Sequence, residues 1–274
     1  MTRRISPLRL NHMNLVVGDF EAAVAHFERV YGAEFLADLP SAEFHACLLG
    51  FGGGMFELFA PNAWLLSARF GPFHLGVEYQ ADMNEVRDVL ASHDVRLIRD
   101  LGKALHTHPD DTLGVSFEFY GLQFTEKVFP ELGRPMAPPS FWRNEHPLGL
   151  SRLKGFAIAV DDIDAALARM SALFDCTVLG EETRPALGAR AICLDLADSR
   201  IELVAPEREG ALTRFLARYG QGIHSTIFAA RDLDLVRDWF DQHGILVGAG
   251  SCEGRLSIPS EANAGAIFEI EAER

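Results

Sequence analysis

The chain has 274 residues, 48% of them hydrophobic, which is enough for one large domain or two domains of ordinary size. Its formal net charge of −14 argues against a nucleic-acid or anionic-membrane partner, since either would need a basic face. Arg3 and Arg4 are followed by no apolar run, and no stretch reaches the roughly 20 apolar residues of a membrane helix. We therefore expect no signal peptide, no membrane span and a cytoplasmic location.

The cysteines fit the same location. They lie far apart in apolar segments and form no CxxC motif, so we expect reduced thiols rather than disulfides or a zinc site. The four are Cys47, Cys176, Cys193 and Cys252.

The first predicted element is an alternating strand over residues 10–17. Asp19 then provides an N-cap for a helix whose apolar positions recur every three or four residues until Gly32, a glycine typical of a helix C-terminus. Further strands follow, and the last covers 55–61. The first module therefore has the order strand, helix and three strands, written βαβββ.

The same order recurs three times along the chain. Opening strands are predicted at 73–79, at 155–160 before a helix capped by Asp162, and at 222–225. Self-similarity of this kind marks an architecture built from repeated units. The four βαβββ modules cover residues 8–61, 72–121, 153–206 and 220–272.

A proline-rich segment at 124–152 separates the second and third modules. Proline is excluded from central strands and helix interiors, so we expect a linker there. It divides the chain into an N-terminal domain, residues 1–123, and a C-terminal domain, residues 153–274. The predicted fold class is α+β, with two tandem domains of two modules each.

Each module carries an acid in its closing strand. This acid follows a position in the opening strand by about 45 residues, and that position is histidine in three of the four modules. A buried carboxylate without a partner is costly, and histidine with carboxylate on buried strands is what a divalent metal site needs. A single glutamate of this kind is more often an edge residue that reaches water, and a single histidine a packed core residue. Recurrence in every module favours a metal site. The pairs are His12 with Glu57, His74 with Glu118, Phe156 with Glu202, and His224 with Glu269.

Several of these stretches resemble the motifs of a known family. They are residues 11–17 with Asp19, the closing strand 57–61, Gly222-Ile223-His224, and the run from His106 to Glu118. Together they are similar to the vicinal oxygen chelate superfamily, which contains glyoxalase I, methylmalonyl-CoA epimerases, extradiol dioxygenases and bleomycin-resistance proteins. The first half is most similar to epimerase-like and glyoxalase-like members. The resemblance implies cup-shaped mixed sheets and one divalent metal ion per chain.

In this superfamily two modules form one cup, and the metal ligands come from its opening and closing strands. If modules pair within each half, the resemblance implies a complete site in the first half, and Phe156 leaves the second half degenerate because phenylalanine cannot bind metal. If the first module pairs with the fourth, another set is complete. The shorter connections within halves favour the first pairing. The two sets are His12, Glu57, His74 and Glu118, and, crossed, His12, Glu57, His224 and Glu269.

Mixed nitrogen and oxygen ligands suit Fe, Mn, Co, Ni or Zn. Such an ion would bind a small molecule through two vicinal oxygens and stabilise the enolate formed when a neighbouring carbon loses a proton, with Glu118 or Glu57 as the base. The chain is thus predicted to be an isomerase, epimerase or lyase. The alternative is an Fe(II) extradiol-type ring-cleaving dioxygenase with His12, His74 and Glu118 as its ligands. A second alternative is a small-molecule binding protein without catalysis.

Four further residues are candidates to face the cup, as supporting groups or accessory acids and bases, although a structural role is the simpler explanation of each. Family epimerases have a lysine after the His-Pro pair where this chain has Asp110, which argues against an acyl-CoA substrate. We expect a small-molecule substrate, no nucleic-acid or membrane partner, and a homodimer as the candidate assembly. The four residues are Glu43, His45, His106 and His108.

Overall fold

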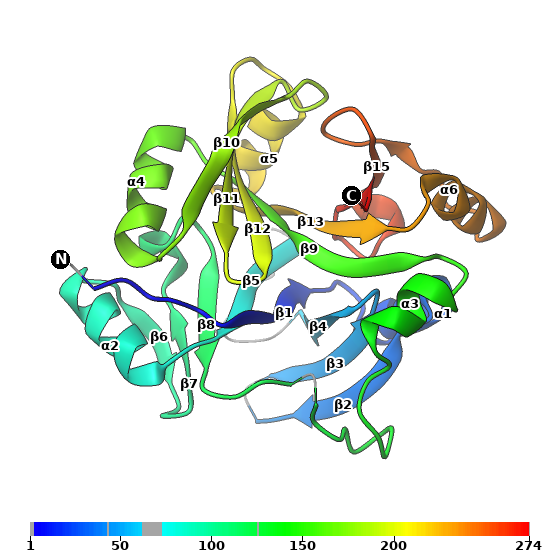
Figure 1. Ribbon diagram of the computed structural model, residues 1–274, viewed down its shortest axis with the longest axis horizontal. Coiled ribbons are helices and arrows are strands. Elements are labelled where there is room, and N and C mark those ends of the chain that lie inside the picture. The colour runs from blue at the N-terminus through cyan, green and yellow to red at the C-terminus, as the bar shows by residue number, and fades with distance from the viewer. Residues whose placement is uncertain (1–2, 43, 62–72, 125, 274) are drawn as a thin grey trace. The chain divides into compact units, whose positions relative to one another are not determined.

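The computed structural model of the protein describes residues 3–42, 44–61, 73–124 and 126–273 (Figure 1). The order of strand, helix and three strands occurs four times along it, which confirms the α+β class and the four βαβββ modules. Module 1 consists of β1 Arg9–Val16, α1 Phe20–Tyr31, β2 Glu34–Pro40, β3 His45–Phe51 and β4 Gly54–Phe59. Module 2 consists of β5 Phe73–Gln80, α2 Met83–Ser92, β6 Leu97–Asp100, β7 Ala104–Thr107 and β8 Ser116–Tyr120.

The second half repeats the pattern after a short helix in the proline-rich segment, α3 Pro139–Asn144. Module 3 consists of β9 Leu150–Ala159, α4 Ile163–Leu173, β10 Thr177–Arg184, β11 Ala189–Leu196 and β12 Ser199–Pro206, and α5 Ala211–Tyr219 follows it. Module 4 consists of β13 Gly222–Ala230, α6 Leu233–Gln242, β14 Gly248–Ala249, β15 Arg255–Ile258 and β16 Phe268–Ala272.

The strands form two mixed eight-stranded sheets, one from each half of the sequence. Their orders are β2-β3-β4-β1-β5-β8-β7-β6 and β10-β11-β12-β9-β13-β16-β15-β14. In modules 1 to 4 the opening strand pairs in parallel with the closing strand of the same module, as β1 does with β4 and β5 with β8. These parallel pairs decide which side chains of the two strands stand next to one another.

Local sequence explains where the helices begin and end. The carboxylate of Asp19 accepts a hydrogen bond from the backbone N–H of Ala22, and Gly32 ends α1 with φ at 65°. Glycine adopts this left-handed conformation without the strain that a side chain would cause. Asp162 caps α4 in the same way, so the predicted capping residues are confirmed. None of the described helices is long and apolar enough to cross a membrane.

The contacts divide the chain into two compact units, each with segments from both halves of the sequence. The predicted domain boundaries at 123 and 153 therefore stay a prediction. One unit comprises Met1–Asn11, Leu75–Gln123 and Gly155–His224, and so holds modules 2 and 3. The other comprises His12–His74, Phe124–Lys154 and Ser225–Arg274, and so holds modules 1 and 4. The strands β1 and β5 each run through both units.

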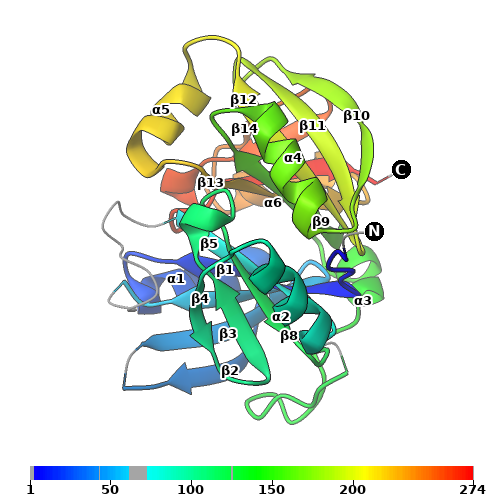
Figure 2. The same cartoon turned by 90° about the vertical axis from the view of Figure 1, so that its left-hand side faces the viewer.

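In the unit with modules 2 and 3, Phe174 lies at the centre of the core. The rings of Phe117 and Phe119 pack on it, and Ile5 forms a backbone bridge with it. The hydroxyl groups of Tyr79 and Ser199 share a buried hydrogen bond of 2.7 Å. Helix α4 packs across β11 and β12, as Figure 2 shows.

The unit with modules 1 and 4 has an aromatic core. Buried rings of this size dominate core energetics, and their contacts add about 0.5–1.5 kcal/mol per pair beyond the area they bury. Asn263 accepts a hydrogen bond of 2.7 Å from the Tyr31 hydroxyl, which satisfies the one polar group of the cluster. The rings are Phe27, Tyr31, Phe51, Phe56, Phe228 and Phe268.

Candidate functional site

His12 is held in β1 by its neighbour on the same face of the strand. Its Nδ1 lies 2.7 Å from Oδ1 of Asn14, and because an amide oxygen can only accept, Nδ1 carries the proton. The lone pair of the ring is then on Nε2, which lies 3.9 Å from Oε2 of Glu57. Asn14 is also the Cα partner of Glu57 in the parallel pair of β1 and β4. Both His12 and Asn14 are buried.

Two buried carboxylates stand side by side where β5 pairs with β8. Glu78 is the Cα partner of Glu118, so both side chains lie on one face of the sheet. The amide nitrogen of Asn11 donates to Oε1 of Glu78 at 2.8 Å and to the backbone oxygen of Leu122 at 3.1 Å. On the next strand, Nε2 of His106 lies 3.2 Å from Oε1 of Glu118. Each carboxylate is therefore positioned by a neutral or basic side chain.

Within the described residues, one group of three buried side chains could share a metal ion: His12, Glu78 and Glu118, whose ligand atoms lie within 4.8 Å of one another. One imidazole and two carboxylates form a donor set that suits a first-row divalent ion. Two buried carboxylates next to each other also disfavour joint ionisation unless a cation compensates them. The donor set therefore fits the ion that the family resemblance implies.

His74, the histidine predicted for this site, has another partner. Its Nε2 shares a hydrogen bond of 2.8 Å with the hydroxyl of Thr226, and its ring lies near Phe268. The register pairs Glu118 with Glu78, and His74 precedes Glu78 by four residues, about 13 Å along the strand. The ligand set that includes His74 stays a prediction.

Glu78 is the one residue of this candidate group that the sequence analysis did not predict. The signal was present, since Glu78 is the one acid in a largely apolar strand that was predicted correctly. What the sequence did not fix was the register of β5 against β8, and a shift in register decides which residue faces Glu118.

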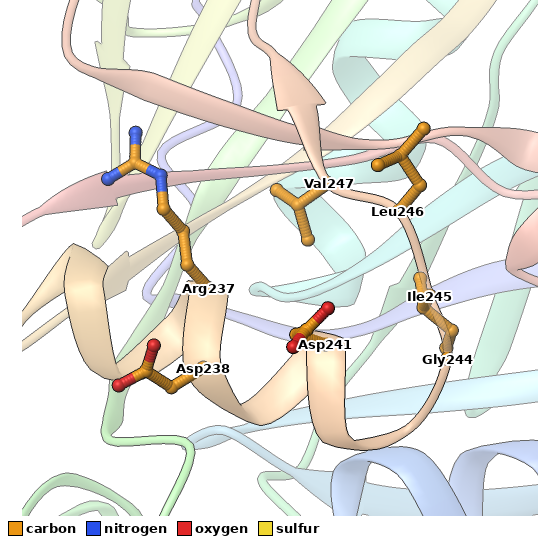
Figure 3. Close-up of a pocket in the computed structure, with 7 residues that line it drawn as sticks. All are labelled: Arg237, Asp238, Asp241, Gly244, Ile245, Leu246 and Val247. Carbon is orange, nitrogen blue, oxygen red and sulfur yellow. The ribbon is translucent and has the colours of Figure 1, made fainter.

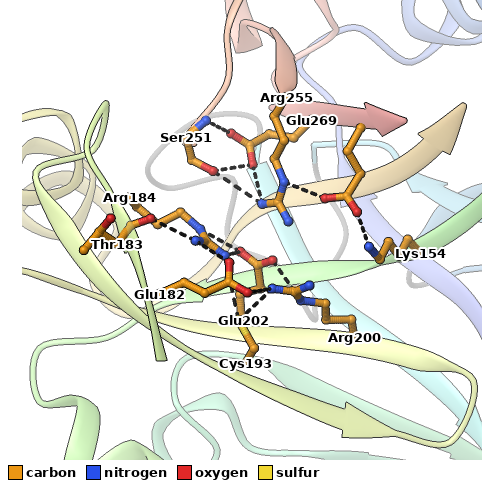
Figure 4. A network of polar contacts seen from close by, with 11 residues as sticks. Lys154, Glu182, Thr183, Arg184, Cys193, Arg200, Glu202, Ser251, Arg255 and Glu269 are labelled. Atoms are coloured by element: carbon orange, nitrogen blue, oxygen red, sulfur yellow. Dashed lines mark hydrogen bonds and ion pairs between the residues drawn. The ribbon is translucent and has the colours of Figure 1, made fainter. Parts of the chain in front are cut away.

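In the second half, Glu202 is held by arginine (Figure 4). Nη2 and Nε of Arg184 lie 2.6 and 3.0 Å from its Oε2, and Nε of Arg200 lies 3.2 Å from its Oε1. Arg184 and Glu202 are both 0% exposed, as is Phe156. This acid forms an internal ion pair with the chain's own cations.

Glu269 has a similar partner in β15 (Figure 4). It accepts hydrogen bonds from the backbone N–H and hydroxyl of Ser251 at 2.6 and 2.7 Å, and Nη1 of Arg255 lies 3.1 Å from its Oε2. His224 lies three residues before Ile227, the Cα partner of Glu269. The crossed ligand set, like the first, stays a prediction. Its acid Glu269 is paired with the guanidinium of Arg255.

His224 is buried as a neutral ring. Its Nδ1 has no hydrogen-bond partner among the described residues, and its ring stands edge-on to Phe215 at 5.0 Å. Burial lowers the pKa of His224 to about 4, because the charged form would lose its hydration.

The accessory candidates fall in different surroundings. His106 lies beside Glu118, as described above. His45 is exposed, and its Nε2 lies 2.7 Å from Oδ1 of Asp38. The Nδ1 of His108 accepts a hydrogen bond from the backbone N–H of Asp110 at the start of a 3₁₀ turn. Glu43 lies outside the described residues.

A pocket of about 520 Å³ lies on α6 and the turn that follows it (Figure 3). None of the candidate ligands lines it. Its lining residues are Arg237, Asp238, Asp241, Gly244, Ile245, Leu246 and Val247.

Comparison with known proteins identifies the family. The model of the glyoxalase/bleomycin resistance protein/dioxygenase superfamily matches residues 156–257. An ethylmalonyl-CoA/methylmalonyl-CoA epimerase of Cereibacter sphaeroides is 32% identical over 133 residues, which cover 44% of this chain and 98% of the epimerase. The chain belongs to this superfamily. The predicted family resemblance is thereby confirmed.

Two solved structures have the same fold over nearly the whole of this chain. A variant of 4-hydroxymandelate synthase from Streptomyces coelicolor has a TM-score of 0.75 at 13% identity and covers 98% of this chain and 93% of its own. Homoprotocatechuate 2,3-dioxygenase from Brevibacterium fuscum has a TM-score of 0.67 at 15% identity and covers 100% of this chain and 73% of its own. At these identities the likeness establishes the fold alone.

Proposed function

We propose that this superfamily member is a divalent-metal-dependent enzyme that acts on a small molecule held through two vicinal oxygens. The observation that carries the proposal is the buried group of His12, Glu78 and Glu118. We further propose that the reaction is a proton transfer, as in an isomerase, epimerase or lyase. The carboxylate-rich donor set and the likeness in sequence to an epimerase support this choice.

The residues have separate roles. Asn14 fixes the tautomer of His12 so that Nε2 is the donor atom, and Asn11 orients Glu78 through its amide. A bound divalent ion would supply open positions for two substrate oxygens and stabilise the negative charge that develops on one of them. The side chains would thus hold the substrate so that the carbon beside its carbonyl group lies within reach of a carboxylate.

Glu57 and Glu118 are the candidate bases. Glu57 is buried on β4 next to Asn14, and Glu118 has His106 at 3.2 Å. A carboxylate that removes a proton must lie within hydrogen-bond reach of it, either directly or through one water. Glu57 can take the proton while Glu118 stays oriented by His106, or the two can exchange these roles.

Metal analysis of the purified protein tests the site. We expect about one equivalent of a divalent ion in the wild type and loss of it in His12→Ala and Glu78→Gln, because each substitution removes a ligand atom. His224→Ala is the matched control and should keep the metal. Melting curves of the variants check that they remain folded. Full metal content in His12→Ala would contradict the proposal.

Solvent exchange tests the reaction. The metal-loaded protein would be incubated in D₂O with small 2-oxo acids, hydroxyketones and acyl thioesters, and deuterium at the carbon next to the carbonyl would be followed by NMR. Exchange that is lost in Glu57→Gln or Glu118→Gln would identify the base. Binding of these molecules with no exchange would instead favour a binding protein without catalysis.

A second candidate is an Fe(II) extradiol-type dioxygenase, favoured by the imidazole of His106 beside Glu118. Two histidines and one carboxylate are the usual ligands of non-haem iron oxygenases. Oxygen uptake with catechols by the Fe(II)-loaded protein tests it. Uptake that is lost in His106→Ala and kept in His74→Ala would establish this reaction in place of the proton transfer.

A further inference from the structure

The proline-rich segment between the halves packs onto module 1. Phe129 is 0% exposed and lies in a buried apolar cluster with Leu48 and Met55. Leu48 is the Cα partner of Glu57, so the cluster lies on the face of the sheet that carries Glu57. The other members of the cluster are Leu36, Ala37, Leu39, Phe124, Leu132 and Met136.

Met136 packs against Gly50 of β3. A Cβ atom built on Gly50 would overlap its sulfur atom, so glycine at this position of β3 leaves room for the methionine side chain. The segment therefore occupies space that the strands of module 1 leave open for it.

Polar contacts with β2 fix the segment in this position. The carboxylate of Glu34 pairs with Arg134 and accepts the backbone N–H of Ala137 at 2.7 Å. Glu131 accepts the backbone N–H of Asp38 at 2.8 Å. These contacts at several points hold the segment against module 1 as a fixed wall of side chains.

Phe124 connects this wall to the candidate ligand. Its ring stands edge-on to the ring of His12, with centroids 5.8 Å apart and an angle of 71° between the planes. The ammonium group of Lys127 lies 5.2 Å from the centroid of the same ring. The aromatic ring is thus held next to the imidazole that the proposed site uses.

We infer that Phe124 and residues 126–137 form the apolar wall of the substrate pocket, and that Phe124 is a specificity-determining residue that limits the group next to His12. The inference rests on the proposed function. It follows that the substrate class is a small chelating molecule with a compact apolar substituent, because Phe124 packs against a cluster that Phe129 and Met136 already help to fill.

Bidentate probes of graded size test the inference without enzymatic turnover. The Co(II)-loaded protein would be titrated with acetohydroxamate, benzohydroxamate and 2-naphthohydroxamate, which bind through two neighbouring oxygens, and the visible absorption of the cobalt would report binding. In Phe124→Ala we expect affinity for the naphthyl probe to rise roughly 10-fold, the usual effect of changing an apolar pocket wall, with the acetohydroxamate affinity unchanged. Phe124→Leu should give a smaller shift in the same direction.

Phe141→Ala is the matched control, since Phe141 lies beyond this wall in α3 of the proline-rich segment and packs on Trp142. Its ratio of naphthyl to acetyl affinity should equal that of the wild type. Cobalt bound with an unchanged ratio in Phe124→Ala would overturn this inference alone. A wild-type protein that binds no cobalt would overturn the proposed function and the inference together.

Discussion

The two halves of the chain keep an acid at the same place in their closing strands and surround it with different partners. In the first half, Glu118 lies beside His106, and Glu57 lies near His12. In the second half, Glu202 is bound by Arg184. A buried carboxylate needs a positive partner, and the second half supplies one from its own chain.

The second half differs from the first in its charges as well as in its donor atoms. Phe156 removes one donor atom, but Arg184 adds a permanent cation beside the remaining acid. Glu269 has the same arrangement with Arg255. A guanidinium that already neutralises the acid removes the electrostatic reason to bind a metal ion. We therefore expect the difference between the halves to lie in charge as much as in the missing histidine.

The largest effect is expected when Arg184, which makes two contacts with Glu202, is replaced. Arg184→Met should lower the free energy of unfolding by about 3–5 kcal/mol, because it removes both Arg184 contacts with the buried Glu202 carboxylate and leaves it only the contact with Arg200. The double variant Arg184→Met with Glu202→Leu should recover most of this loss. Chemical denaturation of the three proteins measures the difference.

Arg190→Met is the control, because Arg190 forms an exposed ion pair with Asp164. Such a pair contributes about 0–1 kcal/mol. Equal stability of Arg184→Met and Arg190→Met would contradict the view that Glu202 depends on an internal cation.

A somewhat smaller effect is expected from the pH dependence of His224, whose Nδ1 has no described partner, whereas that of His12 is bonded to Asn14. The folded-state pKa of His224 is about 4, below the ordinary 6.5. The unfolded chain therefore binds the proton first as the pH falls, and stability is lost between pH 6.5 and 4, by roughly 3 kcal/mol in total.

His224→Phe should remove this part of the pH dependence. The measurement is the free energy of unfolding of both proteins at several pH values from 7 to 4. Carboxylates contribute alike to both proteins and cancel in the difference. A difference that stays constant over this range would show that His224 is protonated as easily in the folded chain as in the unfolded one.

Features set by neighbours in sequence were predictable. Asp19, Asp162 and Gly32 mark helix ends through contacts within a few residues, and the repeated order of elements fixed the fold class. Features set by pairing distant segments were not. Glu78 faces Glu118 through the register of a parallel strand pair, and Arg184 reaches Glu202 across a sheet, so neither was expected.

The proline-rich segment shows the same limit. Its composition correctly excluded central strands, but it carried no sign that Phe129 would be fully buried on module 1. The spacing of apolar residues predicts which face of a helix or strand is buried. An irregular segment has no such regular spacing. Its packing depends on the space left open at residues such as Gly50, which has no side chain and belongs to a different part of the sequence.

The smallest effect we expect is on metal affinity, and it comes from the residue paired with the acid of the closing strand. Asn14 is the Cα partner of Glu57, and Ala157 is the Cα partner of Glu202, so Asn14→Ala gives the first half the residue of the second. Loss of the amide that fixes the His12 ring should weaken metal binding about 10–100-fold. Competition with a chromophoric chelator measures the affinity, and Asn144→Ala, in an exposed position of α3, is the control.

A loss in Asn14→Ala without a change in melting temperature of the metal-free protein would assign the effect to the orientation of His12 rather than to the fold. Unchanged affinity would mean that His12 needs no partner to present Nε2. The halves would then differ only in their donor atoms and their arginines, and Ala157 would have no part in the difference.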